Sequence, residues 1–425
     1  MKYIFFVILF AIFFASSCAD QLDLYSHVAI PPEAVAERDI PALRNGMYWT
    51  VQRAGGATAF ITFDILGGVL MTGTGNERTL INATLSPLGA IVVNSWSGNF
   101  SALYTVNSFI EAVERFSDSP STFNSMARGE AYYFRAYIYY CLATRYGDVP
   151  IIRRNTLDLV RRDPLPQVWA FIEEDLNIAI DLLGASANYY YVSQDAATAL
   201  KARVMLSQGK MAEAAELAES LITSGRYRLD AFENIFRKRP NTEIIFAFEN
   251  QSTAESNINL SDLFYTYAHA VSGQYSYRPT PAVMAMFDDN DTRRAMSIDN
   301  VAGNNVINKY PSGQTGRDPV IISRIAEMYL ISAEAQGRVN GVSRLNELRR
   351  FRGLTDIFPA SDDAFIEAIL LERKKELLAE NFMYYDYVRT GKAAQHLGLL
   401  PHQMVLPISS RELQLNPNLE PNPGY

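Results

Sequence analysis

The sequence predicts a mostly α-helical fold in which helix pairs stack into a tetratricopeptide-like superhelix of about four repeats, decorated by an irregular, loop-rich subdomain with a few short strands. Two observations predict this fold. Helical periodicity recurs in segments of similar length, and a tight glycine turn joins two adjacent segments. Two long stretches lack that periodicity, and one of them is rich in Asn, Ser, Tyr, Gly and Pro.

The expected helical repeats lie near residues 99–224 and 321–381. In residues 126–146, Ala131, Phe134 and Ile138 follow the spacing of one helix face. Around Gly209, small residues flank a turn at which two helices must approach closely. The predicted helices are 99–116, 126–146, 165–183, 195–208, 210–223, 321–337, 342–351 and 362–381. Eight such helices would make four pairs with a continuous core.

The irregular subdomain is expected near residues 54–94 and 225–320. Within it, residues 242–249 carry β-branched and aromatic residues between polar ends, which predicts a strand. Long irregular insertions in a compact chain are usually functional, and binding residues concentrate on loops held by a rigid scaffold. These two stretches are therefore where a ligand is expected.

The first 17 residues are expected to be a signal peptide, and residues 18–425 a single domain. An apolar run of 12 residues, 3–14, follows Lys2. It is too short to cross a bilayer, which needs roughly 20 residues, and it has the length of a signal-peptide core. Small residues then lead to Cys18, the residue that lipoprotein processing modifies. The order of these features favours a lipid anchor on Cys18 over an ordinary exported protein with an incidental cysteine.

Composition narrows the class of partner. The chain has 425 residues, of which 48% are hydrophobic and 12% aromatic, and this excludes a disordered chain. A net charge of −8 gives no electrostatic footprint for nucleic acid, so no nucleic-acid partner is expected. The 24 tyrosines and 23 phenylalanines suit contact with the apolar faces of uncharged ligands.

Catalytic and metal-binding motifs are not recognisable, so no catalytic residue, metal or cofactor is expected. The four histidines lack ligand spacing, and neither a nucleophile elbow nor a phosphate-binding loop is present. The charged residues of 372–380 are interpreted as ion pairs at i, i+4 along one helix face. A carboxylate pair for glycoside hydrolysis remains the alternative. Core positions are expected for Cys141, Trp49, Trp96 and Trp169.

A glycan site needs aromatic rings beside amides or guanidinium groups, because sugars present both C–H faces and hydroxyls. Two loop regions and one segment between helices supply this combination. The candidate ligand-binding residues are Asn257, Tyr265, Tyr267, Gln274, Tyr275, Tyr277 and Arg278 in one loop region, Met71, Asn76 and Arg78 in the other, and Tyr190 between two helices.

Several segments of the chain resemble segments of the SusD/RagB family of outer-membrane nutrient-binding lipoproteins, and they occur in the same order as in that family. One is RGEAYYFRAY at 128–137, followed by YGDVP at 146–150, and another is RIAEMYLISAEA at 324–335. The remaining segments are Asn45–Tyr48, which looks like the family's first helix, and residues 345–354, 372–377, 386–392, 406–408 and 416–425. The resemblance covers most of the chain and adds to the fold expected from periodicity.

The resemblance implies a surface-facing, lipid-anchored protein of the outer membrane that binds an oligosaccharide without catalysis. It also implies delivery of that ligand to a SusC-type TonB-dependent transporter. A peptide-binding member of the same family is the close alternative, and a surface glycoside hydrolase is a more distant one. The resembling segments are interpreted as scaffold, so Arg324, Glu327, Glu372 and Arg389 are expected to hold helices together.

Overall fold

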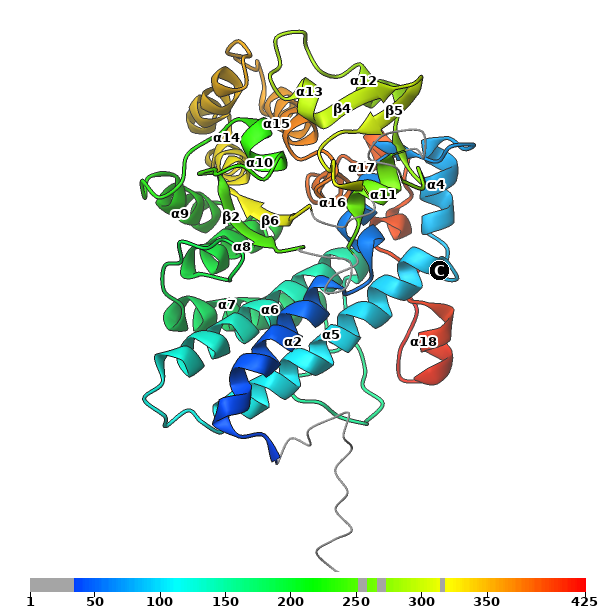
Figure 1. Ribbon diagram of the computed structural model, residues 1–425. Helices are drawn as coiled ribbons and strands as arrows, with labels where there is room; N and C mark the ends of the chain where they lie inside the picture. Colours follow the sequence, from blue (N-terminus) through cyan, green and yellow to red (C-terminus); the bar gives the residue numbers. More distant parts are fainter. Residues whose placement is uncertain (1–33, 251–257, 266–272, 314–317) are drawn as a thin grey trace, which may run out of the picture.

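The helical part of the fold is a series of helices in which each packs against the next (Figure 1). The computed structural model describes residues 34–425, except 251–257, 266–272 and 314–317. The series consists of α2 (Ile40–Gln52), α5 (Ala90–Glu114), α6 (Thr122–Tyr146), α7 (Leu165–Leu182), α8 (Gln194–Ser207), α9 (Met211–Ile222), α14 (Ile325–Phe351) and α15 (Asp362–Glu376). This arrangement confirms the predicted tetratricopeptide-like superhelix.

The predicted helices are confirmed, with corrections at their ends. Helix α5 starts at Ala90, because Val92 and Trp96 continue its buried face. Residues 320–324 form a strand, so the helix predicted from 321 begins later than expected. Helix α14 contains the rest of the first predicted segment, from Ile325, and the whole of the second, 342–351, with non-helical torsion angles at Gly337 between them.

Helix α2 confirms the helix expected at Asn45–Tyr48, and it packs against both α5 and α6. Its inner face is formed by Met47 and Val51, whereas Trp49 points away from that face and is 47% exposed. The expected core position of Trp49 is therefore wrong. The core positions of Trp96, Trp169 and Cys141 are confirmed.

The first irregular stretch is more helical than expected. Between α2 and α5 lie a 3-10 helix at Ala57–Phe60, α3 (Thr62–Leu66), β1 (Leu70–Met71) and α4 (Glu77–Thr84). These elements are short, and no long periodic pattern could have revealed them.

The second irregular stretch mixes strands with short helices. It contains α10 (Phe232–Phe236), β2 (Ile244–Phe248), α11 (Leu260–Phe264), β3 (Arg278–Pro279), α12 (Pro281–Met284), α13 (Arg294–Ser297), β4 (Ile298–Val301), β5 (Asn304–Ile307) and β6 (Val320–Arg324). Strand β2 confirms the predicted strand, and all five of its residues are buried. Within the described residues the strands form antiparallel two-stranded sheets, β1–β3, β2–β6 and β4–β5.

After α15 the chain returns to the N-terminal part of the fold, where α16 (Met383–Arg389) packs against α3. The chain also forms α17 (Ala393–Leu397), a 3-10 helix at Pro401–Met404 and α18 (Ser410–Leu415). Within the part of the chain that the structure describes, no helix combines the length and apolar composition needed to cross a bilayer.

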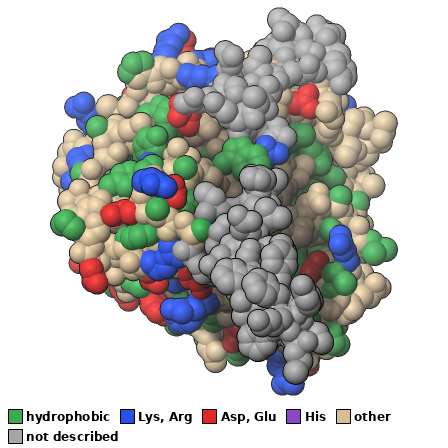
Figure 2. Space-filling model, turned by 60° about the horizontal axis from the view of Figure 1, so that its bottom comes forward, with side chains coloured by type: hydrophobic (Ala, Val, Ile, Leu, Met, Phe, Trp, Pro, Cys, Tyr) green, Lys and Arg blue, Asp and Glu red, His purple; other side chains and the backbone are tan. Residues whose placement is uncertain are grey.

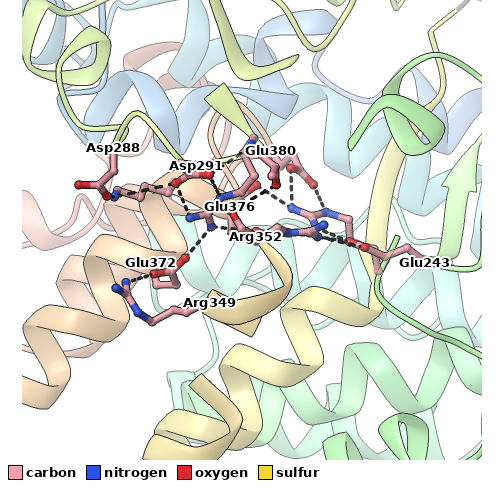
Figure 3. A network of polar contacts seen from close by, with 12 residues as sticks. Glu243, Asp288, Asp291, Arg349, Arg352, Glu372, Glu376 and Glu380 are labelled. Carbon is pink, nitrogen blue, oxygen red and sulfur yellow. Dashed lines mark hydrogen bonds and ion pairs between the residues drawn. The ribbon is translucent and has the colours of Figure 1, made fainter. Parts of the chain in front are cut away.

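A buried network of acidic and basic side chains links β6, α15 and Glu243, the residue before β2 (Figure 3). Glu376 contacts Arg324 at 2.6 Å and Arg352 at 2.8 Å, and all three side chains are at most 1% exposed. Burial alone would raise the pKa of Glu376, but the surrounding guanidinium groups hold that pKa well below its usual range. The scaffold role expected for these charges is thus supported.

The predicted i, i+4 pairing along the helix is wrong, however. Glu372 and Glu376 pair with arginines of other elements, because α15 is buried at this face and its charges need partners from the elements packed on it. Likewise, Glu327 pairs with Arg203 of α8.

Candidate functional site

The two loop regions expected to bind ligand meet at the β1–β3 pair. Met71 lies opposite Arg278 and Leu70 opposite Pro279, and the Thr280 N–H donates to the Val69 carbonyl at 3.1 Å. We call Met71, Gln274, Tyr275, Tyr277 and Arg278 the ledge. Sequence analysis had placed these residues in separate regions, and the strand pairing brings them together.

The segment before β3 is fixed by backbone contacts to α11. Gln274 N–H donates to the Asp262 carbonyl at 2.7 Å, and Tyr277 N–H donates to the Leu263 carbonyl at 2.9 Å. At Gly273 an added Cβ would lie 2.7 Å from the Tyr265 carbonyl oxygen, so glycine permits this close approach. Backbone hydrogen bonds to α11 thereby hold the segment that carries the ledge tyrosines.

The ledge side chains are half-buried, apart from the exposed Gln274. The Tyr275 hydroxyl donates to the Asn305 carbonyl of β5 at 2.8 Å. Burial raises the pKa of both Tyr275 and Tyr277, so both phenols stay neutral. The described residues provide no hydrogen-bond acceptor for the buried Nε–H of Arg278.

Asn76 and Arg78 lie on the exposed start of α4, directly after β1. Asn76 caps that helix by accepting from Thr79 N–H at 2.9 Å. Arg78 donates to the carbonyls of Leu397 and Gly398 at 2.5 and 3.0 Å, and so ties α4 to the end of α17. Both side chains already have structural partners next to the ledge.

The other candidates lie elsewhere. Tyr265 is 1% exposed and its hydroxyl donates to Asn308 Oδ1 at 2.6 Å, so the expectation of an exposed ring is wrong for this residue. Its apolar ring completes the core under the ledge. Tyr190 is half-buried and packs on Tyr189 in a different hydrophobic cluster. Cys18, Asn257 and Tyr267 lie outside the described residues.

Sequence reasoning missed the residues that hold the ledge, namely Asp262, Leu263 and Asn305. They act through backbone carbonyls. A carbonyl is common to every residue type, so no side-chain pattern could have signalled this role.

The ledge provides rings, an amide and a guanidinium group, and its five residues include no acid. Among the described residues no group of three His, Cys, Asp or Glu side chains is placed to hold a metal ion. On the described part of the face in Figure 2, acidic and basic side chains are interspersed without an extended field of one sign. Side chains of these types are able to stack on a sugar ring and to hydrogen-bond its hydroxyls.

Comparison with known proteins places the chain in a family. Residues 20–206 match a family model described as "Starch-binding associating with outer membrane", and residues 300–403 match one described as "SusD family". SusD-like protein P2 of Formosa agariphila is 26% identical, with 91% of this chain and 92% of that protein covered.

Solved structures share the fold. Surface glycan-binding protein A from Bacteroides fluxus superposes with a TM-score of 0.80 at 21% identity, covering 92% of this chain and 100% of the other. A laminarin-binding SusD-like protein superposes with a TM-score of 0.79 at 21% identity, covering 92% and 99%. The two family models, the SusD-like relatives and the shared helical fold agree, and the chain belongs to the SusD/RagB family.

Proposed function

We propose that this protein is a cell-surface lipoprotein that binds an oligosaccharide at the ledge and delivers it to a SusC-type TonB-dependent transporter in the outer membrane. Family membership supports carbohydrate binding, and two structural neighbours are described as a laminarin-binding protein and a surface glycan-binding protein. The proposal includes removal of residues 1–17, lipidation of Cys18, and a single domain over residues 18–425.

The observation that carries the proposal is the pairing of Met71 with Arg278 beside Tyr275 and Tyr277. Neutral phenol rings offer faces for the C–H surface of a sugar. The Arg278 guanidinium and the Gln274 amide offer hydrogen bonds to sugar hydroxyls. Few polar groups placed around apolar surface are typical of a site that orients an uncharged ligand.

Binding without catalysis fits this chemistry. Hydrolysis of a glycosidic bond ordinarily uses two carboxyl groups about 5–9.5 Å apart on either side of the bond. The ledge residues supply no carboxyl group. We therefore propose that the ledge releases its ligand without hydrolysing it.

Binding is tested by calorimetry of the mature chain against laminarin, starch and xylan oligosaccharides and against a panel of tryptic peptides. We expect at least one oligosaccharide to bind, and Tyr277→Ala to weaken it about tenfold, the loss of roughly 1.4 kcal/mol of stacking. Tyr104→Ala is the matched control, because Tyr104 is 63% exposed on α5. Binding of peptides alone would replace the glycan proposal with the peptide-binding alternative.

Delivery and anchoring need a cellular test. Cys18→Ala is expected to release the protein from the outer-membrane fraction, since a thioether to lipid needs the thiol. The wild-type protein is expected to co-purify with a TonB-dependent barrel. Retention of the Cys18→Ala variant in the membrane would contradict lipid anchoring, and absence of any barrel would contradict delivery.

A further inference from the structure

A hollow that contains none of the ledge residues in its lining lies beside the start of β2. Its volume is about 410 Å³, within the range of small-molecule pockets, about 300–1,000 Å³. The connection between α7 and α8 forms one wall, and the segments before α10 and β2 form the other. Its polar and aromatic lining comprises Ser186, Tyr189, Arg226, Tyr227, Asn241 and Thr242.

The floor of this hollow is apolar. Ile244 and Ile245 at the start of β2 line it and are 4% and 1% exposed. The half-buried Tyr189 and Tyr227 add aromatic surface above them. A ligand with one apolar face would therefore displace water from a surface that binds water weakly.

The charges at the rim are internally balanced. Arg226 donates through Nε and Nη2 to the two carboxylate oxygens of Asp195, both at 2.7 Å. The Tyr227 hydroxyl donates to the same carboxylate at 3.1 Å. Within the described residues these contacts leave Nη1 of Arg226 without a partner, and the Arg226 side chain is 51% exposed. The rim thus offers hydrogen-bond donors to a ligand. Because Arg226 and Asp195 neutralise each other, the rim has no net charge that would select an ionic ligand.

We propose that this hollow binds one or two uncharged sugar residues, as a saccharide site separate from the ledge. Rings, a guanidinium group, an amide and hydroxyls around an apolar floor match the two faces of a sugar ring. The lining shares no residue with the ledge, and Tyr189 packs in a different hydrophobic cluster from Tyr275 and Tyr277. The proposal goes beyond delivery from the ledge, because its ligand class follows from the lining of the hollow itself.

The test fills the hollow without disturbing the core. Ala187 lines the hollow on an exposed connection, and the structure shows no backbone hydrogen bond at this residue. Ala187→Trp places a ring in the space. Leu157→Trp is the matched control, because Leu157 is fully exposed on another loop. Ala185→Trp, on the same exposed connection, is the second filling variant should the first fail to fold by circular dichroism.

Saturation-transfer difference NMR is recorded with glucose, galactose, mannose, maltose, cellobiose and laminaribiose. We expect transfer to at least one of them to fall about tenfold in Ala187→Trp and to persist in Leu157→Trp. Transfer that no filling variant reduces, or no transfer at all, overturns the proposal.

The ledge variant Arg278→Ala separates this proposal from the proposed function. Transfer that persists in Arg278→Ala and disappears in Ala187→Trp supports the second site, whatever happens at the ledge. Transfer that disappears in Arg278→Ala and persists in Ala187→Trp overturns the second site and leaves the ledge as the saccharide site.

Discussion

Met71 of β1 lies directly opposite Arg278 of β3, so two segments that are remote in the sequence lie side by side. This pairing depends on backbone groups and does not need either side chain. Side chains of the ledge can therefore be substituted to test ligand binding without loss of the strand pairing.

Arg278→Ala is expected to weaken oligosaccharide binding about tenfold and to leave the free energy of unfolding nearly unchanged. The buried Nε–H of Arg278 has no acceptor among the described residues, so removing this donor strands no acceptor. The Tyr275 hydroxyl, which also contacts the Arg278 side chain, keeps its hydrogen bond to the Asn305 carbonyl. Calorimetry and urea unfolding measure the two effects. Arg38→Ala is the control, because the Arg38 side chain is 88% exposed. A large loss of stability with unchanged affinity would make Arg278 a scaffold residue.

Glu376→Gln is expected to lower the free energy of unfolding by about 3–5 kcal/mol, the cost of leaving buried cations uncompensated. Arg324 and Arg352 would each lose a charged partner at 2.6 and 2.8 Å. The control is Glu174→Gln in the exposed pair Arg153–Glu174, whose loss costs at most about 1 kcal/mol. Similar losses in both variants, measured by urea unfolding, would contradict a stabilising role for the network.

The contribution of Asp64 to the free energy of unfolding is expected to fall as pH rises from about 4 to 7. Burial raises the pKa of Asp64 from 3.8 to about 7, although its oxygens accept from Ala379 and Asn381 N–H. In this window the folded chain holds a proton that the unfolded chain has released, so the slope is up to about 1.4 kcal/mol per pH unit. Asp64→Asn should remove this component of the slope, and Asp118→Asn at an exposed position should retain it. An unchanged slope in Asp64→Asn would show that Asp64 is ionised in the fold.

The helical scaffold could be predicted from sequence because, in a long helix, the spacing of apolar residues identifies the buried face. Residues 126–146 gave such a signal, and α6 has nearly the same limits. Local pattern missed the start of α5, which tertiary contacts extend to Ala90. It also missed β6, because pairing with β2 makes the first residues of the predicted helix 321–337 a strand.

The sequence singled out the ledge residues as candidates, but it did not predict that they assemble at one strand pair. Tyr275, Tyr277 and Arg278 stood out as rings beside a guanidinium group in a loop. The pairing of Arg278 with Met71 is a long-range contact that no local pattern encodes. The same limit explains Tyr265 and Trp49, since exposure at a single position is decided by the element that packs against it.

Gly337 gives a last prediction, in the middle of α14. Its φ of +71° and ψ of 176° belong to a region that side-chain-bearing residues essentially avoid, and they separate the two helical halves. Gly337→Ala is therefore expected to lower the free energy of unfolding by about 1–3 kcal/mol.

Gly46→Ala in α2 is the matched control, because an added Cβ there meets nothing within 4 Å and the residue is helical. That variant is expected to gain about 0.4–1 kcal/mol, since alanine restricts the unfolded chain and favours the helix. Urea unfolding of both variants gives opposite signs if the break in α14 is built into the fold. A gain in stability in Gly337→Ala would instead show that α14 runs straight through this residue.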